Sequence, residues 1–493
     1  MNFYSKRYGS RLNGNIQFPY FVLSKISWND HGYTTSFVLS YHSSSGLKGQ
    51  IIGNVKILNK KADYDIDLND GNDLQDTILE SNFETLSSDY ASLGQSQDYY
   101  DNLKRMFPNE YLQILDSLND IALLPGIWDE IEYKIGFKKS LTRGSTKEFI
   151  SVIRNILYDN NELSSVSKFS YQVQLQGVEQ SHVVKFNFEK YIKYGFRTIV
   201  IIGKNGTGKT QYLHHLSLAL SDNNALGEFV HTDRPLVSRV IAISFSLFDD
   251  FQTPEPSKHS SYKYIGFRHN NRIISPQEIS ERLTNAFNHI KFQEREQDWF
   301  FFINKIIFFD GINNRELEEF ISNEDFAKII ENREILMSSG QNIILFVITE
   351  LIATLRNDSI ILYDEPETHL HPNAIAKFQK VLNSILIKYN SYAIVATHSP
   401  IIVQETPSAN VILFDRVDNI PIIKPLPDEF FGESISNITD KIFYKNEVKA
   451  VYQEFFESCI EQGYSEEQIN EIFGDKLGLN ARLYIAAIAN TKK

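Results

Sequence analysis

Eight residues near the middle of the chain constrain its fold more than any others. Gly203–Thr210 reads Gly-Lys-Asn-Gly-Thr-Gly-Lys-Thr, which fits the phosphate-binding pattern G-x-x-x-x-G-K-T. The apolar, β-branched run 198–202 precedes it and predicts a buried strand, and leucines at helical spacing follow it in 211–216. A strand, a glycine loop and a helix in this order predict an α/β fold in which the loop holds a phosphate group.

Each residue type in this loop suits an anion. Glycines let backbone N–H groups turn inward, and the following helix presents the positive end of its dipole to the same point. Lys209 would reach the β- and γ-phosphates of a nucleotide, and the Thr210 hydroxyl would bind magnesium. The residues expected to contact the nucleotide are Asn205, Gly206, Thr207, Gly208, Lys209 and Thr210. The alternative is a glycine-rich turn with a chance lysine.

The composition is that of a globular protein with several domains. The chain has 493 residues, more than one ordinary hydrophobic core holds. The formal charge of −13 argues against a protein that coats nucleic acid, although a local basic groove stays open. The single cysteine, Cys459, excludes an intrachain disulfide. The polar N-terminus and the lack of a long apolar run predict a cytoplasmic protein with no membrane segment.

Three regions are expected along the chain. Residues 1–165 alternate like strands and then show helical spacing, which predicts an N-terminal α+β domain; within it, 138–147 reads as a basic loop that is solvated or touches phosphate backbone. Residues 166–425 would form the nucleotide-binding domain, with an antiparallel β-subdomain at its start and a helical insertion at about 252–335. Residues 426–493 read as a helical tail.

A second group of polar residues follows two further apolar strands. The run 360–363 ends in Asp364 and Glu365, and 393–397 ends at His398. Parallel strands place such residues at the edge of a sheet where ligands bind. Asp364 would hold magnesium, Glu365 would orient and deprotonate water, and His398 would bond the phosphate or the water. The alternatives are a helix cap or solvated turn for the two acids and a structural role for the histidine.

A further candidate contact begins a long helical stretch. Small residues and a glycine at a helix start offer free N–H groups and hydroxyls to an anion. The residues concerned are Ser338, Ser339, Gly340 and Gln341. The apolar run 343–348 after them predicts a buried helix.

The order of these motifs resembles the ABC-type ATPase superfamily. More closely, D-E-P-E-T-H-L-H-P at 364–372 with T-H-S-P at 397–400 looks like the bacterial AAA family ATPases related to overcoming-lysogenization-defect (OLD) proteins and the Septu ATPase subunit. The resemblance covers about 168–425. It implies an ABC-type P-loop NTPase head: a mixed, largely parallel sheet with flanking helices and an antiparallel β-subdomain.

The resemblance also implies an assembly. Two heads would dimerise head to tail or form a higher oligomer, with ATP between the phosphate loop of one head and the S-S-G-Q segment of the other. Ser338 and Gly340 would then contact the γ-phosphate in trans, His398 would act as the switch histidine, and 370–372 would cross the interface. Hydrolysis would depend on protein concentration, because each site is incomplete in a monomer.

This sequence departs from the family pattern in two places. The glutamine expected after the strand 240–245 is out of register at Gln252, which leaves Ser246 or Asp249 as substitutes in sensing magnesium. The tail 425–493 contains no D-x-D set of the kind that a Toprim nuclease needs. His369 and His371 are metal-ligand types, but they are expected to be loop residues of the dimer interface, and His214 and His215 are expected to be ordinary helix residues.

These observations predict an enzyme that binds ATP and Mg²⁺, hydrolyses ATP, and acts as a dimerisation switch. The resemblance alone suggests the ATPase component of a bacterial anti-phage defence system that controls a separate nuclease or toxin. One alternative is a DNA-repair or DNA-processing ATPase. The other is a non-catalytic scaffold in which the nucleotide is a structural ligand.

Overall fold

The computed structural model falls into two compact units, Met1–Glu433 and Ser434–Lys493. It describes residues 1–12, 16–44, 48–61, 75–143, 147–157, 166–221, 226–231, 234–246, 251, 254–269, 272–306, 339–368, 370–442 and 451–491. The second unit therefore begins at 434, eight residues after the start expected for the tail. Among the described residues, no helix has the length and apolar character needed to cross a membrane.

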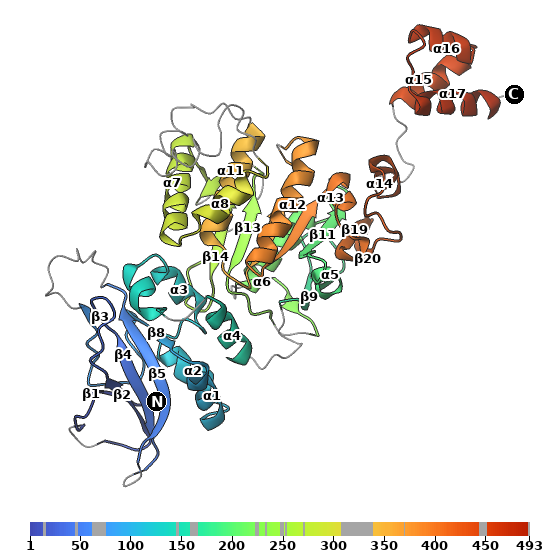
Figure 1. The fold of residues 1–493 in the computed structure, drawn as a ribbon. Coiled ribbons are helices and arrows are strands. Elements are labelled where there is room, and N and C mark those ends of the chain that lie inside the picture. Colours follow the sequence, from blue (N-terminus) through green and yellow to red (C-terminus); the bar gives the residue numbers. More distant parts are fainter. Residues whose placement is uncertain are drawn as a thin grey trace. The chain divides into compact units, whose positions relative to one another are not determined.

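The N-terminal region is an α+β body with its own hydrophobic core (Figure 1). Its six-stranded sheet has the order β7-β1-β2-β4-β5-β8, in which only β1 and β2 run parallel. The strands are β1 (Phe3–Arg7), β2 (Tyr20–Lys25), β4 (Ser36–His42), β5 (Gln50–Asn59), β7 (Asn82–Phe83) and β8 (Tyr90–Gly94), with β3 (Tyr33–Thr34) paired to β6 (Gln75–Asp76). The helices are α1 (Gln97–Met106), α2 (Tyr111–Ser117), α3 (Pro125–Ile131), the π-helix η1 (Phe137–Leu141) and α4 (Lys147–Leu157).

The prediction of a basic loop at 138–147 is wrong for its first residues. Lys138 and Lys139 lie in η1, where the Nζ atom of Lys138 is 2.5 Å from Glu294 Oε1. This basic side chain is therefore paired within the molecule, because a distant part of the chain supplies a carboxylate that the local sequence does not reveal.

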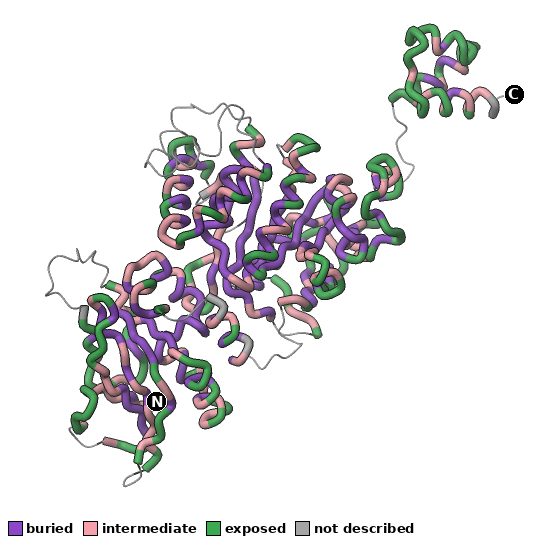
Figure 2. The backbone as a smooth tube through the Cα atoms, viewed as in Figure 1, coloured by how far each residue is buried: buried purple, intermediate pink, exposed green. Residues whose placement is uncertain are grey.

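A seven-stranded sheet forms the centre of the nucleotide-binding region. Its order is β14-β13-β17-β18-β11-β19-β20, and every neighbouring pair is parallel except β19 and β20. The strands are β11 (Thr198–Gly203), β13 (Val240–Ser244), β14 (Tyr262–Gly266), β17 (Ile360–Asp364), β18 (Tyr392–Thr397), β19 (Val411–Val417) and β20 (Ile420–Pro425). Four of them, β11, β13, β17 and β18, are buried along their whole length, as strands covered on both faces must be (Figure 2). The parallel α/β core expected from the sequence is confirmed.

Helices flank this sheet, and a small antiparallel sheet adjoins it. The helices are α5 (Glu189–Ile192), α6 (Lys209–Leu220), α7 (Pro276–Phe292), α8 (Glu296–Ile303), α11 (Ser339–Thr354), α12 (Pro372–Lys388), α13 (Pro400–Gln404) and the short η3 (Ser408–Asn410). The small sheet β10-β9-β12 comprises β9 (Lys168–Val173), β10 (His182–Asn187) and β12 (Glu228–Phe229), and β15 (Arg268–His269) pairs with β16 (Arg272–Ile273). β9 pairs antiparallel with both β10 and β12, which confirms the antiparallel β-subdomain.

The N-terminal region is joined to the sheet at the amino ends of two strands. Arg239 precedes β13, and its Nη2 atom lies 2.7 Å from Asp129 Oδ1 and 2.8 Å from Glu132 Oε1. Arg356 precedes β17, and its Nη2 atom lies 2.6 Å from Asp129 Oδ1 and 2.7 Å from Glu132 Oε2. Burial alone would raise the pKa of Glu132, but the two arginines outweigh it and lower that pKa to about 2. We call these four side chains the amino-edge cluster.

The C-terminal end of α11 lies beside the amino-edge cluster. The Thr354 carbonyl accepts a hydrogen bond from Arg239, and Arg295 donates to the carbonyls of Ile352 (2.6 Å) and Leu355 (2.9 Å). Positive side chains near a helix C-terminus satisfy its unpaired carbonyls and favour its dipole. The C-terminal end of α11 is therefore fixed to the sheet and, through Arg239, to the N-terminal region.

The second unit is helical. It comprises α14 (Ile435–Ile442), α15 (Val451–Glu461), α16 (Glu466–Ile472) and α17 (Leu479–Thr491). A small core of four buried side chains holds the last three helices together: Phe456, Cys459, Ile469 and Ile485.

Candidate nucleotide-binding site

The glycine loop connects β11 to α6, as its sequence predicts. Gly206 and Gly208 have φ angles of 80° and 90°, in the left-handed region that glycine adopts without strain. A Cβ atom on Gly208 would lie 2.6 Å from Leu175 Cδ1, and one on Gly203 would lie 2.2 Å from the Phe414 carbonyl oxygen. The loop therefore depends on glycine for both its turn and its close packing.

Lys209 lies folded along this loop and is almost fully buried. Its Nζ atom donates to the carbonyls of Gly203 (2.8 Å) and Lys204 (3.0 Å). Burial lowers the pKa of Lys209, and the nearby carboxylates of Asp364 and Glu365 oppose that shift. The ammonium group is thus held beside both the loop and the acids that follow β17.

Thr210 and Asp364 meet, although 154 residues separate them in the chain. The Thr210 hydroxyl donates to Asp364 Oδ2 over 2.8 Å, and Asp364 is only 3% exposed. A hydroxyl and a carboxylate in contact are the protein oxygens that Mg²⁺ takes beside a triphosphate, with phosphate oxygens and water completing its shell. The described residues hold no group of three or more His, Cys, Asp or Glu placed to bind a metal alone. The donor set therefore fits a magnesium ion that arrives with a nucleotide.

Glu365 and His398 form the outer part of the site. His398 Nδ1 lies 3.4 Å from Glu365 Oε1, and the imidazole side chain is 47% exposed. The hydrogen bond between them lowers the pKa of Glu365 and raises that of His398. Glu365 has φ 48°, and its N–H donates to the Ala396 carbonyl. This contact orients the backbone of Glu365 beside the end of β18.

The alignment of the parallel strands explains why these residues converge. Asp364 is opposite Ala396 in β18 and Ser244 in β13, and Thr397 is opposite Ile202, which directly precedes the loop. The carboxyl ends of β11, β18, β17 and β13 therefore share one edge. We call this the carboxyl edge.

Sequence reasoning missed Glu367 as a site residue. Its Oε1 atom accepts hydrogen bonds from the Thr397 hydroxyl (2.6 Å) and the His398 N–H (2.8 Å), and lies 3.2 Å from His398 Nδ1. The signal was present, because Glu367 stands two residues after Glu365 in the quoted D-E-P-E motif. Glu367 holds His398 through both its backbone and its ring.

His182 of β10 was also missed. It is 1% exposed, and its Nε2 atom lies 3.4 Å from the Thr207 carbonyl oxygen at the centre of the loop. Burial lowers its pKa, which favours a neutral ring. The antiparallel sheet therefore supports the glycine loop directly, a contact that no local pattern around residue 182 reveals.

The S-S-G-Q segment lies on another element. Ser339, Gly340 and Gln341 begin α11, which packs against α7, α8 and β14; Ser338 lies outside the described residues. Three strands separate β14 from β11 in the sheet. The expected contact of these residues with a γ-phosphate stays a prediction.

The structure describes some of the other candidate residues and not others. His371 caps α12 and accepts from the Asn373 N–H over 3.3 Å, and the rings of His214 and His215 stack on each other in α6. Ser246 lies two residues after the end of β13. Asp249, Gln252 and His369 lie outside the described residues.

Sequence comparisons agree with the motifs. A family model described as "AAA domain, putative AbiEii toxin, Type IV TA system" matches residues 226–404, which contain β13, α11, β17 and β18. A curated relative, "Protein ea59" of Escherichia phage lambda, is 28% identical over 504 residues and covers 94% of this chain and 93% of its own length.

Solved structures similar to this chain include ATP-binding cassettes. CbiO1 of Clostridium perfringens, part of the ABC transporter complex CbiONQ, is 15% identical with a TM-score of 0.26, covering 52% of this chain and 88% of its own. An ABC transporter cassette in its ADP conformation is 14% identical with a TM-score of 0.27, covering 55% and 94%. The glycine loop between β11 and α6 and the order of the parallel strands show a P-loop NTPase fold, and the family model described as an AAA domain matches the part of that fold that follows the loop.

Proposed function

We propose that this protein hydrolyses ATP with Mg²⁺ at the carboxyl edge of the seven-stranded sheet. One observation carries the proposal: Thr210 of the loop contacts Asp364, beside the Glu365–His398 pair, although three separate segments supply these residues. Hydrolysis of a triphosphate requires such a set, with a cation on the phosphates, a metal site and a base for water.

Each side chain has a defined role in this proposal. Lys209 neutralises the β- and γ-phosphates, while Thr210 and Asp364 hold the metal, which supplies charge stabilisation to the phosphates. Glu365, whose pKa is lowered, stays ionised at neutral pH and accepts the proton of the attacking water. His398 lies beside Glu365 and donates a hydrogen bond to the transferred phosphate.

We further propose that two copies complete each site. The resemblance to ABC-type ATPases places the S-S-G-Q segment of one copy on the nucleotide of the other. The position of α11 supports a trans contact. This helix packs on β14, and three strands separate β14 from β11, the strand that leads into the glycine loop. Turnover per protomer should therefore rise with protein concentration.

The decisive experiment is Glu365→Gln in the full chain. If Glu365 is the base, turnover falls by about 10²- to 10⁴-fold while ATP binding persists, and a nucleotide-bound dimer accumulates in sedimentation. Glu405→Gln, at an exposed glutamate after α13, is the matched control and should keep normal turnover. Unchanged turnover and assembly in Glu365→Gln would support the scaffold alternative instead.

In the cell, we propose a role as the ATPase component of a defence system that acts through a separate effector. The family description, which names a toxin of a toxin–antitoxin system, supports this reading. A DNA-processing ATPase is the rival, and it requires turnover that DNA ends stimulate and binding that weakens steeply with salt. A nuclease or toxin gene beside this one would favour the defence role, and DNA-stimulated turnover would favour the rival.

A further inference from the structure

The last three helices of the chain, α15, α16 and α17, form a small unit with little interior (Figure 2). We call residues 451–491 the tail module. Its core comprises four buried side chains. A unit of about 40 residues seldom stays folded on so small a core without a disulfide, a metal ion or a partner. The chain has one cysteine, and the described residues hold no group of three or more His, Cys, Asp or Glu placed to bind a metal. These findings favour a partner.

Large apolar side chains lie together on the surface of this module. Phe455 and Phe473 pack ring against ring, with centroids 5.9 Å apart, yet they are 43% and 40% exposed. Tyr452, 49% exposed, and Val451, 84% exposed, lie one turn before Phe455 on α15. All three aromatic rings contact the buried ring of Phe456. We call Val451, Tyr452, Phe455 and Phe473 the apolar face, and contiguous apolar surface of this kind marks an interaction site.

The module around this face is acidic. Residues 451–491 contain seven acidic and two basic side chains, a formal charge of −5. Glu454 directly precedes Phe455, Glu471 lies two residues before Phe473, and both glutamates are exposed. Within the part of the chain that the structure describes, neither of these two carboxylates has an ion-pair partner.

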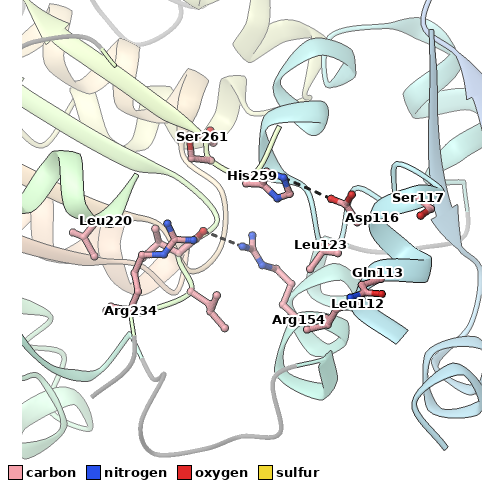
Figure 3. Close-up of a pocket in the computed structure, with 14 residues that line it drawn as sticks. Leu112, Gln113, Asp116, Ser117, Leu123, Arg154, Leu220, Arg234, His259 and Ser261 are labelled. Carbon is pink, nitrogen blue, oxygen red and sulfur yellow. Dashed lines mark hydrogen bonds and ion pairs between the residues drawn. The ribbon is translucent and has the colours of Figure 1, made fainter. Parts of the chain in front are cut away.

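An acid of the first unit shows the contrast. Asp116 of α2 lines a cavity, where its Oδ1 atom lies 3.6 Å from His259 Nε2 (Figure 3). Its Oδ2 atom lies 2.9 Å from the Nζ atom of Lys258. The Asp116 carboxylate is therefore paired within the molecule, whereas Glu454 and Glu471 are placed to attract positive charge from outside it.

The charge of the tail module limits what can cover the apolar face. A second copy of the module would bring the same charge of −5 and would be repelled. Of the charged residues of the chain, 9 of the 62 acidic and 7 of the 49 basic ones lie in 434–493, which leaves a formal charge of −11 for 1–433. Nucleic acids and anionic lipid surfaces are negative as well. The occupant that fits is therefore positively charged and carries an apolar surface.

We propose that the apolar face binds an amphipathic helix of a separate protein, in which lysine or arginine flanks the apolar stripe. Such a helix would pack beside α15 and the end of α16, as amphipathic helices do on apolar surfaces, and would enlarge the small core of the module. Its basic side chains would meet Glu454 and Glu471. This interaction surface goes beyond the proposed ATPase and does not depend on it.

Fluorescence anisotropy of a labelled peptide with the full chain, in the absence of nucleotide, tests this proposal. The probe is a peptide of about five helical turns with leucines along one face and lysines elsewhere. Phe455→Ser should weaken its binding about tenfold, because an aromatic contact is lost. Val451→Ser, at a side chain too exposed to support the fold, should weaken it about threefold. Glu454→Gln combined with Glu471→Gln should also weaken binding and should reduce its dependence on salt.

Two controls separate the apolar face from general stickiness and charge. Ile387→Ser, at a half-exposed isoleucine of α12, and Glu405→Gln should both leave peptide binding unchanged. Equal binding by the full chain and by Phe455→Ser and Val451→Ser would overturn the proposal. So would no binding at about 100 μM protein, or equally tight binding of a peptide with glutamates in place of the lysines. A nucleotide-free dimer that Phe455→Ser dissociates in sedimentation would assign the face to a second copy, and binding to phosphatidylcholine vesicles that Phe455→Ser abolishes would assign it to lipid; either result would also overturn the proposal.

Discussion

The two edges of the seven-stranded sheet gather charged side chains in opposite ways. At the amino edge, Arg239 is 0% exposed and Arg356 4%, and both are bound to Asp129 and Glu132. At the carboxyl edge, His398 is nearly half exposed, and Glu365 and Glu367 share it. Strand ends collect charge in both places, but the two arginines of the amino edge are buried, whereas the histidine of the carboxyl edge reaches solvent.

The difference distinguishes a structural cluster from a candidate site. A buried pair that is fully bonded holds two parts of a protein in register, and removing one partner leaves the other charged and desolvated. A partly exposed pair can exchange its partners for a phosphate or a water molecule. Burial and completeness of bonding, more than the identity of the residues, therefore separate the two edges.

The largest effect is expected from Glu132→Gln at the amino edge. The change removes the charge that two buried arginines share, so it should lower the free energy of unfolding by about 3 to 5 kcal/mol in denaturant titrations. Glu130→Gln is the control, since Glu130 is 55% exposed in a surface pair with Lys60 and should cost less than about 1 kcal/mol. An equal loss of unfolding free energy in the two variants would mean that the amino-edge cluster does not hold the N-terminal region to the sheet.

The same cluster should give the stability a defined pH dependence. The pKa of Glu132 is lowered from an ordinary 4.5 to about 2, so its contribution is complete above pH 4.5 and is lost as the pH falls toward 2. Glu132→Gln should flatten the curve of stability against pH over that interval, while Glu130→Gln should leave it as it is.

At the carboxyl edge, Lys209→Ala tests the phosphate loop. Loss of a charge-assisted contact to the phosphates should weaken ATP binding about 100-fold, equivalent to about 2.7 kcal/mol, in equilibrium binding measurements. Lys204→Ala, in the same loop, removes a positive charge that the motif does not require and should cost less than about tenfold. Tight binding in Lys209→Ala would contradict the assignment of the loop.

A smaller effect is expected from Glu367→Gln. The amide keeps one acceptor oxygen but loses the charge beside His398, so kcat should fall about tenfold with little change in KM, as for other residues that orient a site through a neighbour. A change confined to KM would place Glu367 in substrate binding. An unchanged kcat would make its hydrogen bonds to Thr397 and His398 purely structural.

The smallest effect is a shift in the titration of His398. Its pKa is raised above 6.5, mainly by the hydrogen bond with Glu365, so NMR should show it falling in Glu365→Gln and falling less in Glu367→Gln. The stability that this pair contributes is complete between pH 4.5 and 6.5, and it is lost as the pH rises through the raised pKa of His398 or falls through the lowered pKa of Glu365. A larger fall of the His398 pKa in Glu367→Gln than in Glu365→Gln would mean that Glu367, and not Glu365, contributes more to raising that pKa.

Much of the carboxyl edge could be predicted because its signals are local. The glycine loop lies between its strand and helix within about twenty residues, and each apolar strand ends in the residue of interest. The meeting of Thr210 and Asp364 follows from a general property of parallel sheets. Glu367 could also have been identified, since it lies in the same motif.

The amino edge could not be predicted, because its signals are distant. Arg239 and Arg356 stand 107 and 224 residues from Glu132, and an isolated arginine in a sequence indicates a surface residue. β14 was missed for a related reason: Tyr262–Gly266 contains a lysine, and the region 252–335 reads as loop and helix. Its place in the sheet depends on pairing with β13, not on its own composition.

The fixed C-terminal end of α11 makes that helix a lever arm. Its 16 residues span about 24 Å, so a tilt of about 5° about the end held by Arg239 and Arg295 would move the opposite tip by about 2 Å. That tip carries Ser339 and Gly340. A small tilt of α11 about its fixed end would thus be magnified into a displacement of about 2 Å at the residues that are proposed to contact the phosphate.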